Sequence, residues 1–472
     1  MTVTDTTPTQ DARPVPFRVS GSVATGSILQ PLNSSMIAIA IVGIAAQFGP
    51  SSGIAWVISA LYIATAVTAP MAGKLGSLLG ARRVYLGGLA LVALGSIAGL
   101  LAPSVGWLIF SRILVGIGTA TQYPNAMTMI RGYAEKYDAQ PRTAITTLAI
   151  CSQAVVALGP TLGGLLVGAF GWQAIMWINL PIIAFSALAV VRFADVGFVG
   201  GSSVGHRQLL HSLDLAGVLL FLVRVSSTML FLLSSTSEPL WWLLPVWALA
   251  LAAFVQWERR ATEPFIDVRA LTRNRALGAT LARTLLTYTA FYCVFFGVPQ
   301  WLQYSRGMSA TEAGLTMLPV AVVGIGSTML ASRIYRRHGA RRTLAVGTCA
   351  LLLGGLLLAS VERSTAPIVV LLLVAAVLGI PNGFNNIGNQ NLISSVTSVE
   401  EVGTAIGMYR TVQYIGANLS AVVLQATAGH IIGDDGLHRT GWFIAAAGVV
   451  LLVGVLTSRN MRDSRSSQVS AV

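Results

Sequence analysis

The chain has 472 residues, of which 54% are hydrophobic and only 10% are charged. Soluble globular domains carry about 25% charged residues, so this composition excludes an ordinary soluble protein. The net charge of +13 could suggest nucleic-acid binding. However, the basic residues stand in short clusters between apolar runs, as the positive-inside rule expects of a membrane protein. We therefore expect the partner to be a lipid bilayer and not a nucleic acid.

Apolar runs long enough to cross a hydrocarbon core of ~30 Å recur along nearly the whole chain. They predict about fourteen transmembrane helices and an all-α polytopic fold. The predicted helices are residues 24–48, 55–75, 84–102, 106–130, 143–169, 172–193, 213–233, 239–257, 276–300, 312–335, 342–361, 366–392, 404–431 and 440–458. An even number of spans places both chain ends on one side of the membrane.

The chain divides into two six-helix bundles and an insertion between them. The expected parts are a polar tail (1–23), a first bundle (24–196), a Gly/Ser-rich linker (197–212), an extra helix pair (213–257), a loop (258–275), a second bundle (276–458) and a tail (459–472). Most basic residues fall on the side of the chain ends, whereas the other side carries only Arg306, Arg363 and Arg439. This asymmetry predicts a multi-pass protein of the cell membrane with both termini in the cytoplasm.

An internal repeat supports the division into two halves. The connection 73-GKLGSLLGARR-83 follows the second predicted helix, and 332-SRIYRRHGARR-342 follows the tenth. Repeated halves are typical of secondary transporters, which hold a small-molecule substrate between the halves near the middle of the membrane. The extra pair falls outside this repeat.

Polar side chains within the apolar runs are the candidate substrate-binding residues, because embedded polar groups are costly and often functional. In the twelfth predicted helix, Asn382, Asn385, Asn386 and Asn389 share one face with Gln390 by helical spacing. The fourth helix contributes Gln122, Tyr123 and Asn125, and the ninth contributes Tyr288 and Tyr292. The alternative is that the amides bond neighbouring helices and the tyrosines only pack.

Arginines also fall inside the apolar runs. Arg112 lies well inside its helix, and we expect a functional role for it rather than an extended side chain that reaches the membrane surface. Arg283 and Arg410 lie near helix ends, where such surface-reaching side chains are expected. Arg224 has no evident carboxylate partner. No phosphate-binding loop and no metal-ligand spacing of histidines is present, so we expect no cofactor, no metal and no enzymatic activity.

Several segments resemble the major facilitator superfamily, specifically its fourteen-helix drug:proton antiporter branch. Residues 73–83 are similar to the signature G-x-L-x-D-R-x-G-R-R, although Ser77 stands at the Asp position and Leu78 at the Arg position. The segment 112-RILVG-116 resembles the element R-x-x-x-G, and 159-GPTLGG-164 with the following 171-GWQAIMWINLPI-182 resembles the antiporter motif and the next helix. Residues 264–277 and 299–319 are similar to the second half of the branch.

The resemblance implies roles for residues outside the polar stripes. It implies a role in energy coupling for Arg112. It implies a role in gating or helix contact for Gly73, Gly80, Arg82, Arg83, Gly159, Pro160, Gly163, Gly164, Gly339, Arg341 and Arg342. The implied function is export of small hydrophobic or amphipathic compounds by alternating access, coupled to protons, by a monomer. A dedicated metabolite or lipid exporter, or an uncoupled facilitator, is the alternative.

The first helix departs from the pattern of the branch. Where the branch has L-D-x-T, this chain has Leu32, Asn33, Ser34 and Ser35, so an amide replaces a titratable carboxylate. We expect Asn33 to line the substrate path. For proton coupling three hypotheses remain: Asp214 or Glu312 carries the proton, Arg112 acts through water, or coupling is lost.

Overall fold

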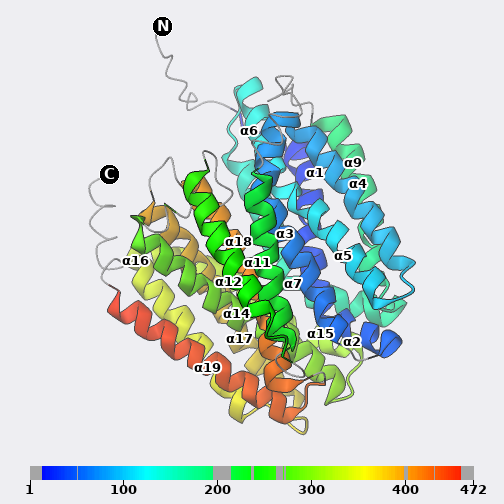
Figure 1. Ribbon diagram of the computed structural model, residues 1–472, viewed down its shortest axis with the longest axis vertical. Coiled ribbons are helices and arrows are strands. Elements are labelled where there is room, and N and C mark those ends of the chain that lie inside the picture. Colours follow the sequence, from blue (N-terminus) through cyan, green and yellow to red (C-terminus); the bar gives the residue numbers. More distant parts are fainter. Residues whose placement is uncertain are drawn as a thin grey trace.

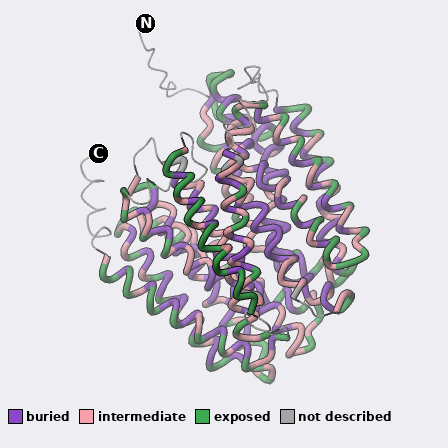
Figure 2. Tube along the Cα trace, in the orientation of Figure 1, coloured by how far each residue is buried: buried purple, intermediate pink, exposed green. Residues whose placement is uncertain are grey.

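The computed structural model describes residues 13–49, 52–194, 214–234, 239–261, 269, 273–397, 402–429 and 431–458. The predicted linker 197–212 and tail 459–472 lie outside these residues. Helices dominate the described chain, because backbone polar groups in lipid must bond within their own segment. Large apolar side chains on the outside remain exposed, such as Leu249, which is 72% exposed, and Figure 2 shows such exposed residues along the outer helices.

The first bundle lies on the right of Figure 1. It contains α1 (Phe17–Ser27), α2 (Leu29–Phe48), α3 (Ser52–Leu79), α4 (Ala81–Leu100), α5 (Val105–Ala120), α6 (Gln122–Lys136), α7 (Arg142–Phe170), α8 (Ala174–Trp177) and α9 (Asn179–Phe193). The first helix begins at Phe17, earlier than the predicted start at residue 24. Ser20 and Ser22 on this extra stretch are buried, which explains why a polar sequence there still packs as helix.

The second bundle contains α14 (Arg275–Tyr304), α15 (Ala310–Thr316), α16 (Leu318–Ser360), α17 (Ile368–Val396), α18 (Val402–Ala428) and α19 (Asp434–Thr457). The long α16 breaks at Gly339, whose φ of 78° is accessible to glycine at little cost. Gly80, with φ of 92°, separates α3 from α4 in the same way. The two GARR segments therefore make the same turn in both halves.

The extra pair, α11 (Leu215–Ser234) and α12 (Leu243–Arg260), lies in front of the junction between the bundles in Figure 1. The two helices pack on each other, and α11 also contacts α3 and α18. Phe221, Val225 and Phe254 form an apolar cluster with Ile63 and Ala66 of α3. The pair thus rests on the junction, outside the core of both bundles.

The predicted fold class is confirmed in the described part of the chain. Nine helices there are long and apolar enough to span a membrane, and a bent pair within α3 makes a tenth. The described helices form fourteen segments on the following count. Three consecutive pairs, α1–α2, α5–α6 and α8–α9, each count as one span, and α15–α16 counts as two spans that meet at Gly339. Below, the end of the bundles that carries the Gly80 and Gly339 turns is named the basic end, and the other is named the opposite end.

Candidate functional site

One close contact between the two bundles lies where α7 crosses α15. Gly164 lies against Gly314 so tightly that a Cβ atom on Gly164 would stand 2.5 Å from the carbonyl oxygen of Ala310. Thr161 Oγ1 donates a hydrogen bond to the Gly314 carbonyl (2.8 Å), and Thr311 Oγ1 donates to the Gly164 carbonyl (3.2 Å). This contact lies toward the opposite end, and the absence of side chains on both glycines allows it.

The other residues of the GPTLGG segment face their own bundle. A Cβ on Gly163 would stand 3.0 Å from Cα of Met36 in α2, and Gly159 faces Ser35 on the same helix. Pro160 lies inside α7. The segment therefore fits α7 to α2 on one side and, through Gly164, to the second bundle on the other.

The basic-end turns carry matching arginine contacts. Arg82 Nη2 donates to the carbonyl of Val191 (2.9 Å), in the last turn of α9, and Arg341 Nη2 donates to the carbonyl of Leu456, in the last turn of α19. Each arginine thus satisfies a free carbonyl at the end of the last helix of its own bundle. Arg83 and Arg342 are exposed, and a side chain on Gly73 would meet open space.

Arg112 is fully buried in the first bundle. Its Nη2 donates to the carbonyl of Asn33 (2.9 Å) and its Nε to the carbonyl of Val57 (3.3 Å), while Nη1 has no hydrogen-bond partner. The Asn33 side chain pairs reciprocally with the Asn179 amide, at 2.8 and 3.0 Å. Asn179 also donates to Ser96 Oγ (2.9 Å). Asn33 therefore lies in a buried amide network directly beside the embedded arginine.

The three candidate residues of the fourth predicted helix lie on α6, and their side chains point in two directions. Gln122 and Asn125 face their own bundle, where Gln122 Nε2 donates to the Tyr85 carbonyl (3.2 Å) and Asn125 Nδ2 donates to the Ala72 carbonyl (3.2 Å). Their spacing of three residues places them on one face of α6, and Tyr123 points elsewhere. The Tyr123 ring lies under the guanidinium of Arg410 in the second bundle, 4.3 Å from its centroid. Only Tyr123 of the three reaches across to the other half.

The asparagines of α17 also fall into two groups, one buried and one half-buried. Asn385 and Asn389 are buried, and Asn389 Oδ1 accepts a hydrogen bond from Arg283 Nε (2.9 Å). Asn382 and Asn386 are half-buried and line a water-sized cavity together with Asn385 and Tyr288. The surface-reaching interpretation of Arg283 and Arg410 is wrong, because one guanidinium bonds an amide in the bundle and the other lies on a ring of the first bundle.

Tyrosines from both bundles meet at the centre of the molecule. Tyr62 of α3 contacts Tyr292 of α14 and Tyr414 of α18, with ring centroids 5.5 and 6.1 Å apart. Tyr288 contacts Tyr292 and Tyr409 at 6.2 and 6.3 Å. These five residues are named the tyrosine cluster. Tyr62, Tyr409 and Tyr414 were not predicted from the sequence, because their partners lie on helices far away along the chain.

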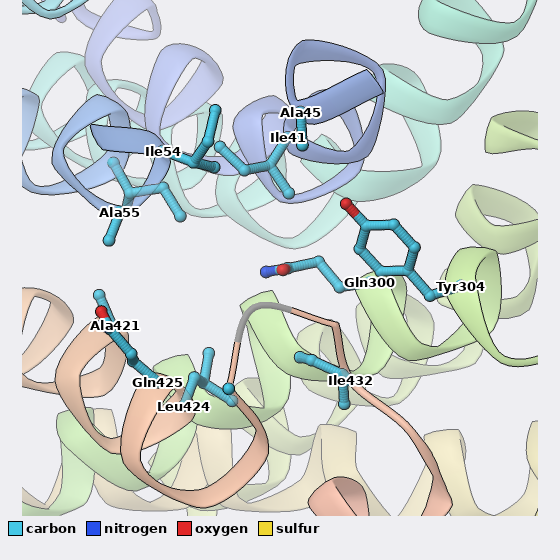
Figure 3. Close-up of a pocket in the computed structure, with 12 residues that line it drawn as sticks. Ile41, Ala45, Ile54, Ala55, Gln300, Tyr304, Ala421, Leu424, Gln425 and Ile432 are labelled. Carbon is cyan, nitrogen blue, oxygen red and sulfur yellow. The ribbon is translucent and has the colours of Figure 1, made fainter. Parts of the chain in front are cut away.

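A cavity of about 70 Å³ lies between the bundles near the opposite end. Figure 3 shows its walls: Ile41 and Ala45 of α2 and Ile54 and Ala55 of α3 face Gln300 and Tyr304 of α14 and three residues of α18. Ligand pockets usually hold about 300–1,000 Å³. A drug-sized molecule therefore does not fit here unless the bundles separate at this end.

Glu362 is a buried acid that the sequence placed in an ordinary connection between helices. It is 2% exposed, its Oε2 has no hydrogen-bond partner, and burial raises its pKa to about 8, while the charge of Arg306 opposes the shift. Nε2 of His438 lies 2.7 Å from the Glu362 backbone carbonyl. A single Glu between two apolar runs carries no local signal of this burial.

Solved structures share this architecture. The crystal structure of the nucleoside transporter NupG matches 93% of this chain and 98% of its own, with a TM-score of 0.62 at 16% identity. The likeness shows the fold of this chain, which consists of two helical bundles joined across a central interface.

The family follows from sequence comparison. The model of the Major Facilitator Superfamily matches residues 23–421 and 284–468, and the chain belongs to that family. The chain is 33% identical over 445 residues to the uncharacterized MFS-type transporter YwoD of Bacillus subtilis (strain 168), covering 94% of this chain and 97% of the relative. It is 29% identical over 444 residues to the tetracenomycin C resistance and export protein of Streptomyces glaucescens, covering 91% of this chain and 79% of the relative.

Proposed function

We propose that this transporter belongs to the fourteen-helix antiporter branch and exports small hydrophobic or amphipathic compounds by alternating access. The relative from Streptomyces glaucescens is named a resistance and export protein, which supports this direction of transport. A multidrug resistance protein of Mycobacterium tuberculosis, Stp, supports a drug-like substrate at 30% identity over 377 residues. The protein acts as a monomer in the cell membrane, with both termini cytoplasmic.

The contact of α7 with α15 is the observation that carries the proposal. Alternating access needs an interface that can close one end of the path and separate without unfolding either bundle. The Gly164–Gly314 contact is close, small and held by threonine hydrogen bonds of the kind worth about 0.6 kcal/mol each in membranes. Such an interface closes tightly and opens at modest cost.

The substrate path then runs between the bundles from the basic end to the tyrosine cluster. Half-buried Tyr123, Tyr288 and Tyr292 and the amides Asn382 and Asn386 provide the mixed apolar and polar surface that binding sites for small molecules use. The bundles 24–196 and 276–458 move against each other, and the pair 213–257 covers their junction. The basic turns stay at the cytoplasmic side.

Proton coupling is the second part of the proposal. Arg112 is the embedded charge beside the position where the branch carries its carboxylate, and its unbonded Nη1 gives it capacity for water or a substrate group. Arginine stays protonated, so it acts on a neighbouring group and does not itself release the proton.

An uncoupled facilitator, or an exporter dedicated to one metabolite or lipid, is the second candidate. One observation favours the uncoupled form: the Asn33 amide is satisfied by Asn179 in a neutral, reciprocal pair. A neutral pair cannot gain or lose a proton in the physiological range, so this network holds no proton carrier.

Transport by purified protein in proteoliposomes tests the proposal. A panel of hydrophobic and amphipathic compounds is loaded inside or outside, with and without an imposed pH gradient. We expect uptake or efflux of several panel members above that of protein-free liposomes, and acceleration by the gradient if coupling holds. Gly164→Leu, confirmed as inserted and monodisperse, should lose transport. Absence of movement for every compound in both conditions would overturn the proposed function.

A further inference from the structure

Four arginines lie in the middle turns of described helices, where no described acid lies. Arg112, Arg224, Arg283 and Arg410 lie about 10–14 Å into their helices, at 1.5 Å per residue. The acids in the described part of the chain stand at helix ends or in connections: Glu135, Asp138, Asp214, Glu258, Glu312, Glu362, Asp434 and Asp435. Embedded arginines usually pair with carboxylates or mark a functional path.

Three of these arginines are placed by groups outside the junction of the bundles. Arg112 bonds backbone carbonyls of Asn33 and Val57, and Arg283 bonds Asn389. Arg224 lies about 5.5 Å from the rings of Phe221 and Phe254 in the extra pair. These contacts account for their positions within single bundles or within the insertion.

Arg410 alone of these four reaches across the junction. It stands on α18, and its guanidinium lies on the Tyr123 ring of α6, in the other bundle, at 4.3 Å. Tyr288, Tyr409 and Tyr414 surround it on its own side. Although it lies deep in the molecule, Arg410 is only half-buried, as are Tyr123, Tyr288 and Tyr414. A permanent cation is therefore partly accessible at the centre of the proposed path.

We infer that the central site takes planar aromatic anions, with Arg410 as their counter-ion and the tyrosine cluster as their stacking surface. The inference rests on the proposed function and assigns its substrate class. A guanidinium offers a planar fork of N–H donors that matches a carboxylate in two hydrogen bonds. The tyrosine rings offer edge and face contacts to an aromatic body, and their hydroxyls can donate to the anion.

The geometry also gives the anion a place to enter. A carboxylate on Arg410 would replace the Tyr123 ring, which is the contact that links α18 to α6. Substrate binding and the separation of the two bundles on that side therefore involve the same guanidinium. An aromatic amine would find the same rings but would meet a fixed positive charge, and no described carboxylate lies in the middle turns of a helix to balance it.

A charge series on one ring system tests this inference. The probes are 1-naphthoate, 1-naphthamide and 1-naphthylmethylamine, which share a bicyclic body and differ in charge. Binding to purified full-length protein is measured by titration, and transport is measured in liposomes of neutral phosphatidylcholine, so that anionic lipid does not compete. We expect 1-naphthoate to bind at least tenfold more tightly than the amide, and the amine to bind most weakly.

Variants separate the charge from the fold. Arg410→Gln should reduce the preference for the anion over the amide to about onefold, while binding of the neutral amide changes less than threefold. Arg410→Lys should keep a preference over the amine, because the charge remains. Arg224→Gln removes an arginine at similar depth outside the tyrosine cluster, and it should leave the preference unchanged.

The outcomes distinguish the inference from the proposed function. If the unmodified protein binds the amine as tightly as the acid, or if Arg410→Gln keeps the preference, the anion site is refuted even where neutral compounds are exported. If none of the three probes binds, the inference is likewise overturned. If 1-naphthoate binds through Arg410 but no compound crosses the membrane, the anion site stands and the proposed export fails.

Discussion

Replacement of Gly164 by alanine should shift the balance between the two facing states. The added Cβ would stand 2.5 Å from the Ala310 carbonyl oxygen and 2.8 Å from Cα of Gly314, and both are backbone atoms that cannot rotate away. Ordinary contact begins near 3.4 Å, so the helices must separate by roughly the difference. Overpacking of this kind costs about 1–3 kcal/mol. About 1.4 kcal/mol changes an equilibrium constant tenfold, so the population of the state closed at the opposite end should fall by roughly 5- to 140-fold.

Labelling of a cysteine in the cavity of Figure 3 measures this shift. Ala45 lines that cavity and is 7% exposed, so Ala45→Cys should react slowly with a membrane-impermeant maleimide. Addition of Gly164→Ala should raise the labelling rate. The matched control is Gly87→Ala, because a Cβ on Gly87 meets nothing within 4 Å while the gain in helix propensity is the same. Equal labelling rates in the Gly164 and Gly87 variants would refute the closing role of this contact.

Three further predictions concern topology, coupling and pH. Reporters fused after Val472 and within residues 197–208 should both show a cytoplasmic location, and a location outside the cell at either would contradict the proposed orientation. Asn33→Asp should introduce a titratable group beside Arg112, and proteoliposome efflux should then gain dependence on an imposed pH gradient; unchanged dependence would exclude position 33 as the site where coupling was lost. Burial raises the pKa of Glu362 from 4.5 to about 8, so its neutral form stabilises the fold fully below pH 4.5 and that stability is lost as the pH rises through about 8. The Tm should therefore fall between pH 5 and 8, and the Tm of Glu362→Gln should fall less over the same range; an equal fall would assign the dependence to other groups.

The repeated turns were predictable because they depend on local chemistry. The two GARR segments are identical in sequence, and in each a glycine with positive φ precedes a helical stretch that begins Ala-Arg-Arg. The structure adds what each first arginine contacts, which is the end of the last helix in its bundle. That partner lies about a hundred residues away in both halves, so only the tertiary fold reveals it.

The direction of single side chains was harder to predict than the helices. The sequence indicates that Gln122 and Asn125 share a face, but periodicity cannot say whether that face meets the other bundle or its own. The backbone carbonyls of Ala72 and Tyr85 decide this, because they accept hydrogen bonds from both amides inside the first bundle. Arg410 shows the converse: its place near a helix end suggested the membrane surface, whereas a ring on α6 holds it in the interior.

The distribution of contacts indicates where this protein can move. Within each bundle, an arginine ties the turn after the second helix to the last turn of the final helix, and glycines such as Gly163 and Gly416 let α7 and α18 lie directly on α2 and α14. Between the bundles, the contacts include the Gly164–Gly314 pair, threonine hydrogen bonds, the Tyr62 ring against the rings of Tyr292 and Tyr414, and the Arg410 guanidinium on the Tyr123 ring. Interhelical hydrogen bonds in membranes contribute only about 0.6 kcal/mol each, so the threonine hydrogen bonds of this interface can break at modest cost. We therefore expect the bundles to separate at this junction, with Arg410 exchanging the Tyr123 ring for a substrate.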